Sequence, residues 1–101
     1  MIKNNSIDDL LKKIITFINK NDLKNAEKET KKALEKFPDN HLFYDLMGSI
    51  SLKKNEINNS IKFYEKALSI NSDFIGSILN LGVAFQKLGK DEEALLNFRS
   101  A

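Results

Sequence analysis

Apolar side chains recur every three or four residues along most of the chain, which is the spacing found on the buried face of an amphipathic helix. The first such stretch runs from Ile7 to Ile18, and similar stretches follow it between short polar segments. No stretch sustains the alternation of apolar and polar residues that a β-strand requires. The pattern predicts six helices and no strand, with the helices over residues 6–19, 23–37, 40–53, 57–70, 73–87 and 91–101.

The segments between these helices are of two kinds. Residues 19–22, 53–56 and 87–90 are short polar turns, which leave consecutive helices antiparallel and adjacent. The other breaks follow Phe37 and Ile70 and separate one helix pair from the next. Pro38 cannot continue a helix, and Asp39 or Asp73 can accept a bond from a free amide of the following first turn.

The sequence repeats itself with a period of 34 residues and no gap. Gly48 falls on Gly82 at this spacing, and Ala33, Ala67 and Ala101 form a series of three. The period predicts three units over residues 7–40, 41–74 and 75–101 within a single domain, residues 1–101. The third unit stops at position 27 of 34, so it is truncated.

At these positions the chain resembles the tetratricopeptide repeat family, whose 34-residue helix–turn–helix unit carries small and aromatic residues at fixed places. The small residues at unit positions 8 and 20 and the aromatic residue at position 24 match at Gly48, Gly82, Ala26, Ser60, Ala94, Tyr64 and Phe98. The first unit departs from this pattern, with Ile14 at position 8 and Thr30 at position 24. The resemblance implies an all-α fold, a right-handed superhelical stack of antiparallel helix pairs (an α-solenoid) with about six helices.

In that family the first helix of each pair lines a concave groove. The resemblance assigns twelve residues to a partner-binding groove here: Leu11, Ile15, Ile18, Leu42, Asp45, Ser49, Leu52, Lys53, Leu79, Val83, Gln86 and Lys87. An exposed strip of apolar side chains marks a binding surface on many proteins, and the strip expected here consists of Leu11, Ile15, Ile18, Leu52, Leu79 and Val83. We therefore expect a scaffold for protein–protein interactions that binds a peptide or an amphipathic helix, with Asp45, Lys53 and Lys87 adjusting the charge.

Some members of the family clamp the C-terminal carboxylate of heat-shock chaperones with Lys, Asn and Arg side chains in the groove. The first unit has Leu11 and Ile15 at the clamp positions, the second has Ser49, and the third has Gly76 and Asn80. These departures argue against that particular function.

Composition narrows the possible partners and the cell compartment. The chain has 16 basic and 14 acidic residues, a balance too even to predict a nucleic acid or an anionic membrane as partner. It has no cysteine, no apolar segment of the kind found in signal peptides and no run of about 18 apolar residues that could span a bilayer. These features favour a cytoplasmic protein.

The sequence offers little chemistry for catalysis. His41 is the only histidine, and a lone histidine cannot supply the several ligands of a zinc site. The acidic runs Asp8–Asp9 and Asp91–Glu93 are predicted at first turns, where the helix dipole stabilises them. We therefore expect no enzymatic activity, no catalytic or metal-binding residue and no cofactor.

A set of lysines with helical spacing is interleaved with glutamates in the second predicted helix, and it is interpreted as a solvated face: Lys24, Lys28, Lys31, Lys32 and Lys36. Glu27 and Lys31 have the spacing and order of a favourable ion pair within a helix.

Two alternatives to a peptide scaffold stay open. The truncated third unit has no polar capping helix, so the chain is expected either to be part of a longer protein or to have its open end covered by another chain. In the first case it could be the N-terminal repeat domain of a larger, transferase-like enzyme. In the second it could be a structural module that self-associates through its groove or through its open C-terminal end.

Overall fold

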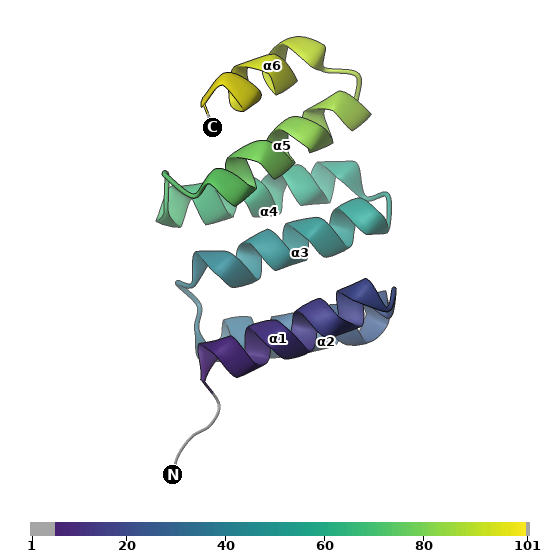
Figure 1. Cartoon of the computed structure of the whole chain (residues 1–101), viewed down its shortest axis with the longest axis vertical. Coiled ribbons are helices and arrows are strands. Elements are labelled where there is room, and N and C mark those ends of the chain that lie inside the picture. Colours follow the sequence, from purple (N-terminus) through teal and green to yellow (C-terminus); the bar gives the residue numbers. More distant parts are fainter. Residues whose placement is uncertain (1–5, 101) are drawn as a thin grey trace.

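The computed structural model describes residues 6–100, which fold into six helices connected as three antiparallel pairs (Figure 1). The pairs are α1 (Ile7–Asn19) with α2 (Leu23–Lys36), α3 (His41–Lys53) with α4 (Ile57–Ile70), and α5 (Ile75–Lys87) with α6 (Asp91–Ser100). They stack into an elongated all-α solenoid of 49 × 26 × 18 Å. The six predicted helices are confirmed, with ends that differ by two residues at most. Ala101 lies outside the described residues.

The turn inside each pair has the same backbone geometry in all three units. Asn21, Asn55 and Gly89 occupy equivalent places with positive φ angles of 60°, 65° and 80°. The amide of the following residue donates to a carbonyl of the preceding helix, as from Glu56 to Ser51 at 2.8 Å. Glycine and asparagine tolerate this left-handed conformation better than other residues, which explains their presence here.

The N-terminal caps of the helices differ in part from those expected. Ser6 Oγ accepts a bond from the amide of Asp9 and begins α1. The cap of α3 is Asn40, whose Oδ1 accepts from the amide of Leu42 at 2.9 Å. Helix α5 begins after Phe74 without a side-chain cap. The prediction that Asp39 or Asp73 caps these helices was therefore wrong. Each helix begins two residues after the aspartate, so the N-cap position falls on Asn40 or Phe74 instead.

Small and large side chains interlock between the helices of each pair. A β-carbon on Gly82 of α5 would lie 2.6 Å from Cε1 of Phe98 on α6, so the aromatic ring rests on the glycine. The sizes are reversed in the first pair, where Ile14 and Thr30 occupy the same two positions and are both fully buried. This reversal accounts for the departure of the first unit from the repeat pattern.

One cluster of buried apolar side chains from α1, α2 and α3 forms the core of the N-terminal half: Ile14, Ile18, Ala26, Ala33, Phe43, Met47 and Ile50. Ile18 is only 8% exposed, which corrects the expectation that it contributes to an exposed apolar strip. Its side chain is buried because α1 packs against both α2 and α3.

Candidate functional site

The first helices of the three pairs share one face of the stack. Helices α1, α3 and α5 lie in front in Figure 1, with α2 and α4 behind them. Helix α1 contacts α3, and α3 contacts α5. Among the described residues, the second helices of neighbouring pairs make no such contact, neither α2 with α4 nor α4 with α6. Because the first helices are closer together than the second ones, the stack is concave on their side. We refer to this side as the concave face.

A pocket of about 480 Å³ lies where α3 and α5 meet on the concave face. We call it the α3–α5 pocket, and its lining consists of Ser49, Leu52, Lys53, Asn55, Tyr64, Asn80 and Lys87. The ammonium groups of Lys53 and Lys87 are exposed, and the lining contains no carboxylate. The pocket is therefore positively charged, and it combines hydrogen-bonding groups with the aliphatic side chain of Leu52.

Beside the pocket, a carboxylate connects α3 to α5. Asp45 Oδ1 accepts a bond from the hydroxyl of Ser77 at 2.8 Å and one from Nδ2 of Asn80 at 3.4 Å. Burial raises the pKa of the Asp45 carboxyl above its usual value, although the two hydrogen bonds act in the opposite direction. Since Asn80 also lines the pocket, Asp45 fixes the orientation of one of the pocket's polar groups.

Tyr64 closes the inner wall of the pocket from α4. It is fully buried, and its hydroxyl lies 3.2 Å from Oγ of Ser49. Burial raises the pKa of Tyr64 to about 12, so the phenol is neutral at physiological pH. The buried phenol therefore adds no negative charge to the pocket.

The structure brings some of the predicted groove residues together and separates others. Ser49, Leu52, Lys53 and Lys87 line one pocket, and Asp45 adjoins it through Asn80. The others differ in exposure, with Ile15, Leu79 and Gln86 exposed, Leu11, Leu42 and Val83 half-buried, and Ile18 in the core. Ile18 is thus lost from the expected apolar strip, and polar residues accompany Leu52 in the pocket.

Three residues of the pocket lining were missed by the sequence reasoning. Tyr64 was assigned to packing between helices, and Asn80 was considered only as a departure from the chaperone clamp. Asn55 lies in the turn after α3, where its left-handed backbone places it beside the pocket. The 34-residue period located this turn, but periodicity alone does not show which of its side chains face the groove.

His41 has a structural environment. Its Nε2 lies 3.3 Å from Nδ2 of Asn71, and its ring meets Phe74 edge to face, with centroids 4.8 Å apart. These contacts hold the start of α3 against the segment that leads into α5. No group of three His, Cys, Asp or Glu residues in the described part of the chain is placed to hold a metal ion. None of the described helices is long and apolar enough to cross a membrane.

The acidic run at Asp8 and Asp9 lies exposed in the first turn of α1, as predicted. The corresponding run 91–93 begins α6, but its side chains lie outside the described part of the structure.

Comparison with known proteins gives one family match and several structural ones. Residues 42–74 match the family model described as tetratricopeptide repeat. No curated protein sequence matches the chain. Among solved structures, MamA superposes with a TM-score of 0.83 at 20% identity over 95% of this chain. This chain spans 56% of the length of the MamA chain.

Two further similar structures are complexes. The second TPR of Spaghetti (RPAP3), bound to the HSP90 peptide SRMEEVD, has a TM-score of 0.84 and 17% identity over 91% of this chain and 85% of that chain. The TPR2B domain of yeast Sti1, in complex with pHsp70, has a TM-score of 0.86 and 16% identity over 92% of this chain and 74% of that one. At these identities the likeness is one of fold.

Proposed function

We propose that the protein is a non-catalytic scaffold that binds a peptide segment on its concave face. Residues 42–74 match the tetratricopeptide repeat model, and the described part of the chain has the fold of that family. The α3–α5 pocket is the observation that carries this proposal, because it joins two cations, hydrogen-bonding groups and apolar surface in one depression. Ligand sites commonly combine these features.

The ligand that suits this surface is an amphipathic peptide with an acidic side chain. Its apolar residues would rest on the exposed parts of Ile15, Leu52 and Leu79, which lie on the three first helices. Its carboxylate would lie between Lys53 and Lys87, where no acidic residue of the pocket lining competes for them. Asp45 would act indirectly, by holding Asn80 toward the pocket.

The similar structures support a peptide as the ligand class. The Spaghetti (RPAP3) domain holds a peptide that contains three acidic residues, SRMEEVD, and the Sti1 domain is in complex with pHsp70. The lysines of the present pocket belong to the ends of α3 and α5 and lie outside the chaperone-clamp positions, two of which, Ser49 and Asn80, also line the pocket without the clamp's side chains. We therefore propose a peptide ligand that is recognised through a different set of contacts.

Selection from a random library of peptides of about twelve residues tests this proposal, because a helix of that length spans several turns. Enriched peptides should contain acidic and apolar residues, and their affinity should fall about tenfold or more for Lys53→Glu with Lys87→Glu. A Leu79→Glu variant should weaken them as well, while Ile70→Glu, an exposed apolar residue at the end of α4, should leave binding unchanged. Enriched peptides that bind all of these variants equally would exclude the concave face.

Self-association through the concave face is the alternative to peptide binding, and the Leu79→Glu variant can distinguish the two. Light scattering at two protein concentrations should give the monomer mass of 11.5 kDa for the unmodified chain. A dimer that Leu79→Glu converts to a folded monomer would instead place the concave face in an interface between two copies.

A further inference from the structure

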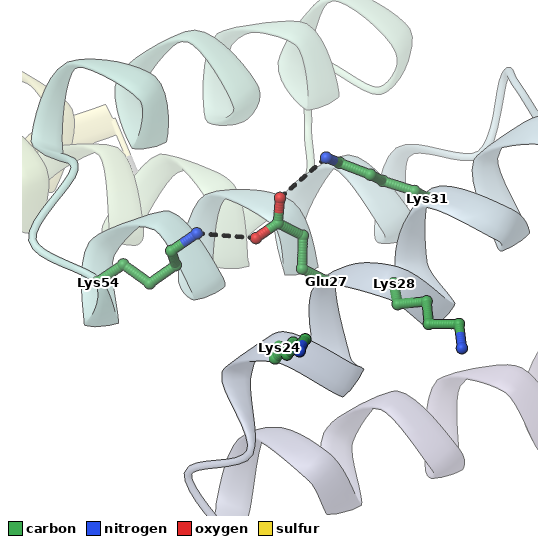
Figure 2. A pocket seen from close by; sticks show the side chains of 5 residues that line it. All are labelled: Lys24, Glu27, Lys28, Lys31 and Lys54. Atoms are coloured by element: carbon green, nitrogen blue, oxygen red, sulfur yellow. Dashed lines mark hydrogen bonds and ion pairs between the residues drawn. The ribbon is translucent and has the colours of Figure 1, made fainter.

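A second pocket lies away from the concave face, between α2 and the end of α3 (Figure 2). It has a volume of about 490 Å³ and is lined by Lys24, Glu27, Lys28, Lys31 and Lys54. We call these five residues the Glu27 cluster. Four of them come from α2, and Lys54 is the C-cap residue of α3.

Glu27 organises two of the four lysines. Its Oε1 accepts a bond from Nζ of Lys54 at 2.8 Å, and its Oε2 lies 2.9 Å from Nζ of Lys31. The hydrogen bonds from Lys54 and Lys31 hold the pKa of the Glu27 carboxyl below its usual value. The carboxylate stays ionised at neutral pH, and Figure 2 shows it between the ammonium groups of Lys31 and Lys54, to which dashed lines join it.

The other two lysines are not neutralised. Lys24 and Lys28 are exposed, lie one helical turn apart on α2, and form no ion pair with any described residue. The cluster therefore carries a formal charge of +3, whereas the whole chain carries +2. Glu56 lies nearby, with its Oε2 3.6 Å from Nζ of Lys54. If Glu56 is counted with the cluster, the net charge is +2, which equals that of the entire chain.

We propose that the Glu27 cluster is a docking site for a short acidic segment of another protein, separate from the concave groove. Neighbouring carboxylates of such a segment would bind Lys24 and Lys28, and would share Lys31 and Lys54 with Glu27. The aliphatic stems of the lysines supply the apolar part of the contact. The adjacent residues Lys53 and Lys54 would then serve two different sites.

Features of the same helix favour a peptide over a nucleic acid. The pocket lining contains no aromatic side chain on which a base could stack. Glu35 lies exposed on α2 one turn beyond Lys31, so an extended phosphate backbone that follows this helix would meet negative charge on leaving the pocket. A segment with two or three carboxylates fits within the cluster and avoids Glu35.

Fluorescence anisotropy with labelled hexaglutamate tests this site, because that probe lacks the apolar residues that the concave groove requires. At about 150 mM salt, where the Debye length is about 8 Å, hexaglutamate should bind and hexaglutamine should not. Lys24→Ala with Lys28→Ala should weaken binding roughly fivefold or more. Glu27→Gln should strengthen it about twofold, because it removes the competing carboxylate and frees Lys31 and Lys54.

Matched variants remove the same charge elsewhere. The double variant Lys62→Ala with Lys66→Ala deletes two lysines one turn apart on α4. The double variant Lys53→Ala with Lys87→Ala deletes the two lysines of the α3–α5 pocket. Both double variants should retain hexaglutamate binding. Circular dichroism checks that every variant is folded. The proposal is overturned by absent hexaglutamate binding, by binding lost only in the α3–α5 pocket variant, or by tighter binding of hexathymidylate that depends on Lys24 and Lys28. None of these outcomes bears against peptide binding in the groove.

Discussion

The ring of Tyr64 rests on the α-carbon of Gly48, so close that a β-carbon at position 48 would lie 2.5 Å from Tyr64 Cε1. Tyr64 is fully buried, and its hydroxyl is placed 3.2 Å from Ser49 Oγ, so burial and this contact hold the ring in place. The size of residue 48 therefore sets the separation of α3 from α4. This pair also forms the inner wall of the α3–α5 pocket, so the packing shapes the proposed binding surface.

Replacement of Gly48 by alanine should destabilise the fold. Overpacking of a close contact costs about 1–3 kcal/mol, while alanine gains about 1 kcal/mol over glycine in a helix interior. Since the 2.5 Å contact places the overpacking cost in the upper part of that range, we expect a net loss of about 1–2 kcal/mol in the free energy of unfolding, measured by urea denaturation. Gly76→Ala is the comparison, since its β-carbon would meet the Phe74 ring at 3.1 Å and should cost less. Unchanged stability of Gly48→Ala would show that the ring yields easily.

The first unit suggests a way to rescue this contact. Ile14 and Thr30 occupy the positions of Gly48 and Tyr64 with the sizes exchanged, and both are fully buried. In a double-mutant cycle, Gly48→Ile and Tyr64→Thr should together be less destabilising than the sum of the single changes, by about 1–2 kcal/mol. Additive effects would mean that the two sites do not fill a shared space.

The helices and their pairing could be predicted from sequence because both depend on local periodicity. The repeat identified Gly82 and Phe98 as its small and aromatic residues, and the structure brings the two into contact. The burial of Ile18 did not follow, because it depends on contact of α1 with α3 as well as with α2. The N-cap of α3 was also misplaced, since Asp39 and Asn40 are neighbouring residues with similar capping ability.

The turn at Gly89 allows a test of backbone strain alone. Its φ is +80°, and a β-carbon built there would meet nothing within 4 Å. Gly89→Ala should therefore destabilise by about 1 kcal/mol through the left-handed conformation. Gly89→Asn should cost less, because asparagine occupies the equivalent places at residues 21 and 55. Thermal unfolding of the two variants under identical conditions gives the comparison, and equal losses would contradict this explanation.

Asp45 should make stability depend on pH in the direction opposite to a typical ion-paired aspartate. Burial raises its folded-state pKa above the usual 3.8, so between these two values the folded chain binds more protons than the unfolded chain. Its contribution to stability is then greatest below pH 3.8 and is lost as the pH rises through the folded-state pKa.

Asp45→Asn removes this titration while it keeps an acceptor for Ser77 and Asn80. Urea denaturation from pH 3.5 to 7 should show that the stability of the unmodified chain relative to the variant declines as the pH increases. A relative stability that increases with pH would mean that the two hydrogen bonds outweigh burial.

The composition of the candidate site was less predictable than the fold. Lys53 and Lys87 were found because they share one position in the repeat, and they line the same pocket. Asp45, Ser49 and Lys53 were expected in the groove, but the part played by Asn80 was not, because it depends on a contact with Asp45 on another helix. A repeat alignment assigns positions along one helix, but it does not contain such contacts between units.

Backbone NMR tests the central claim most directly, since a chain of 11.5 kDa suits amide chemical-shift mapping. The measurement is the titration of ¹⁵N-labelled protein with a peptide enriched from the random library. Our account predicts that the largest shift changes fall on the concave face, at Ser49, Lys53, Asn80 and Lys87. Changes confined to the outer surfaces of α2 and α4, with the concave face unaffected, would contradict it.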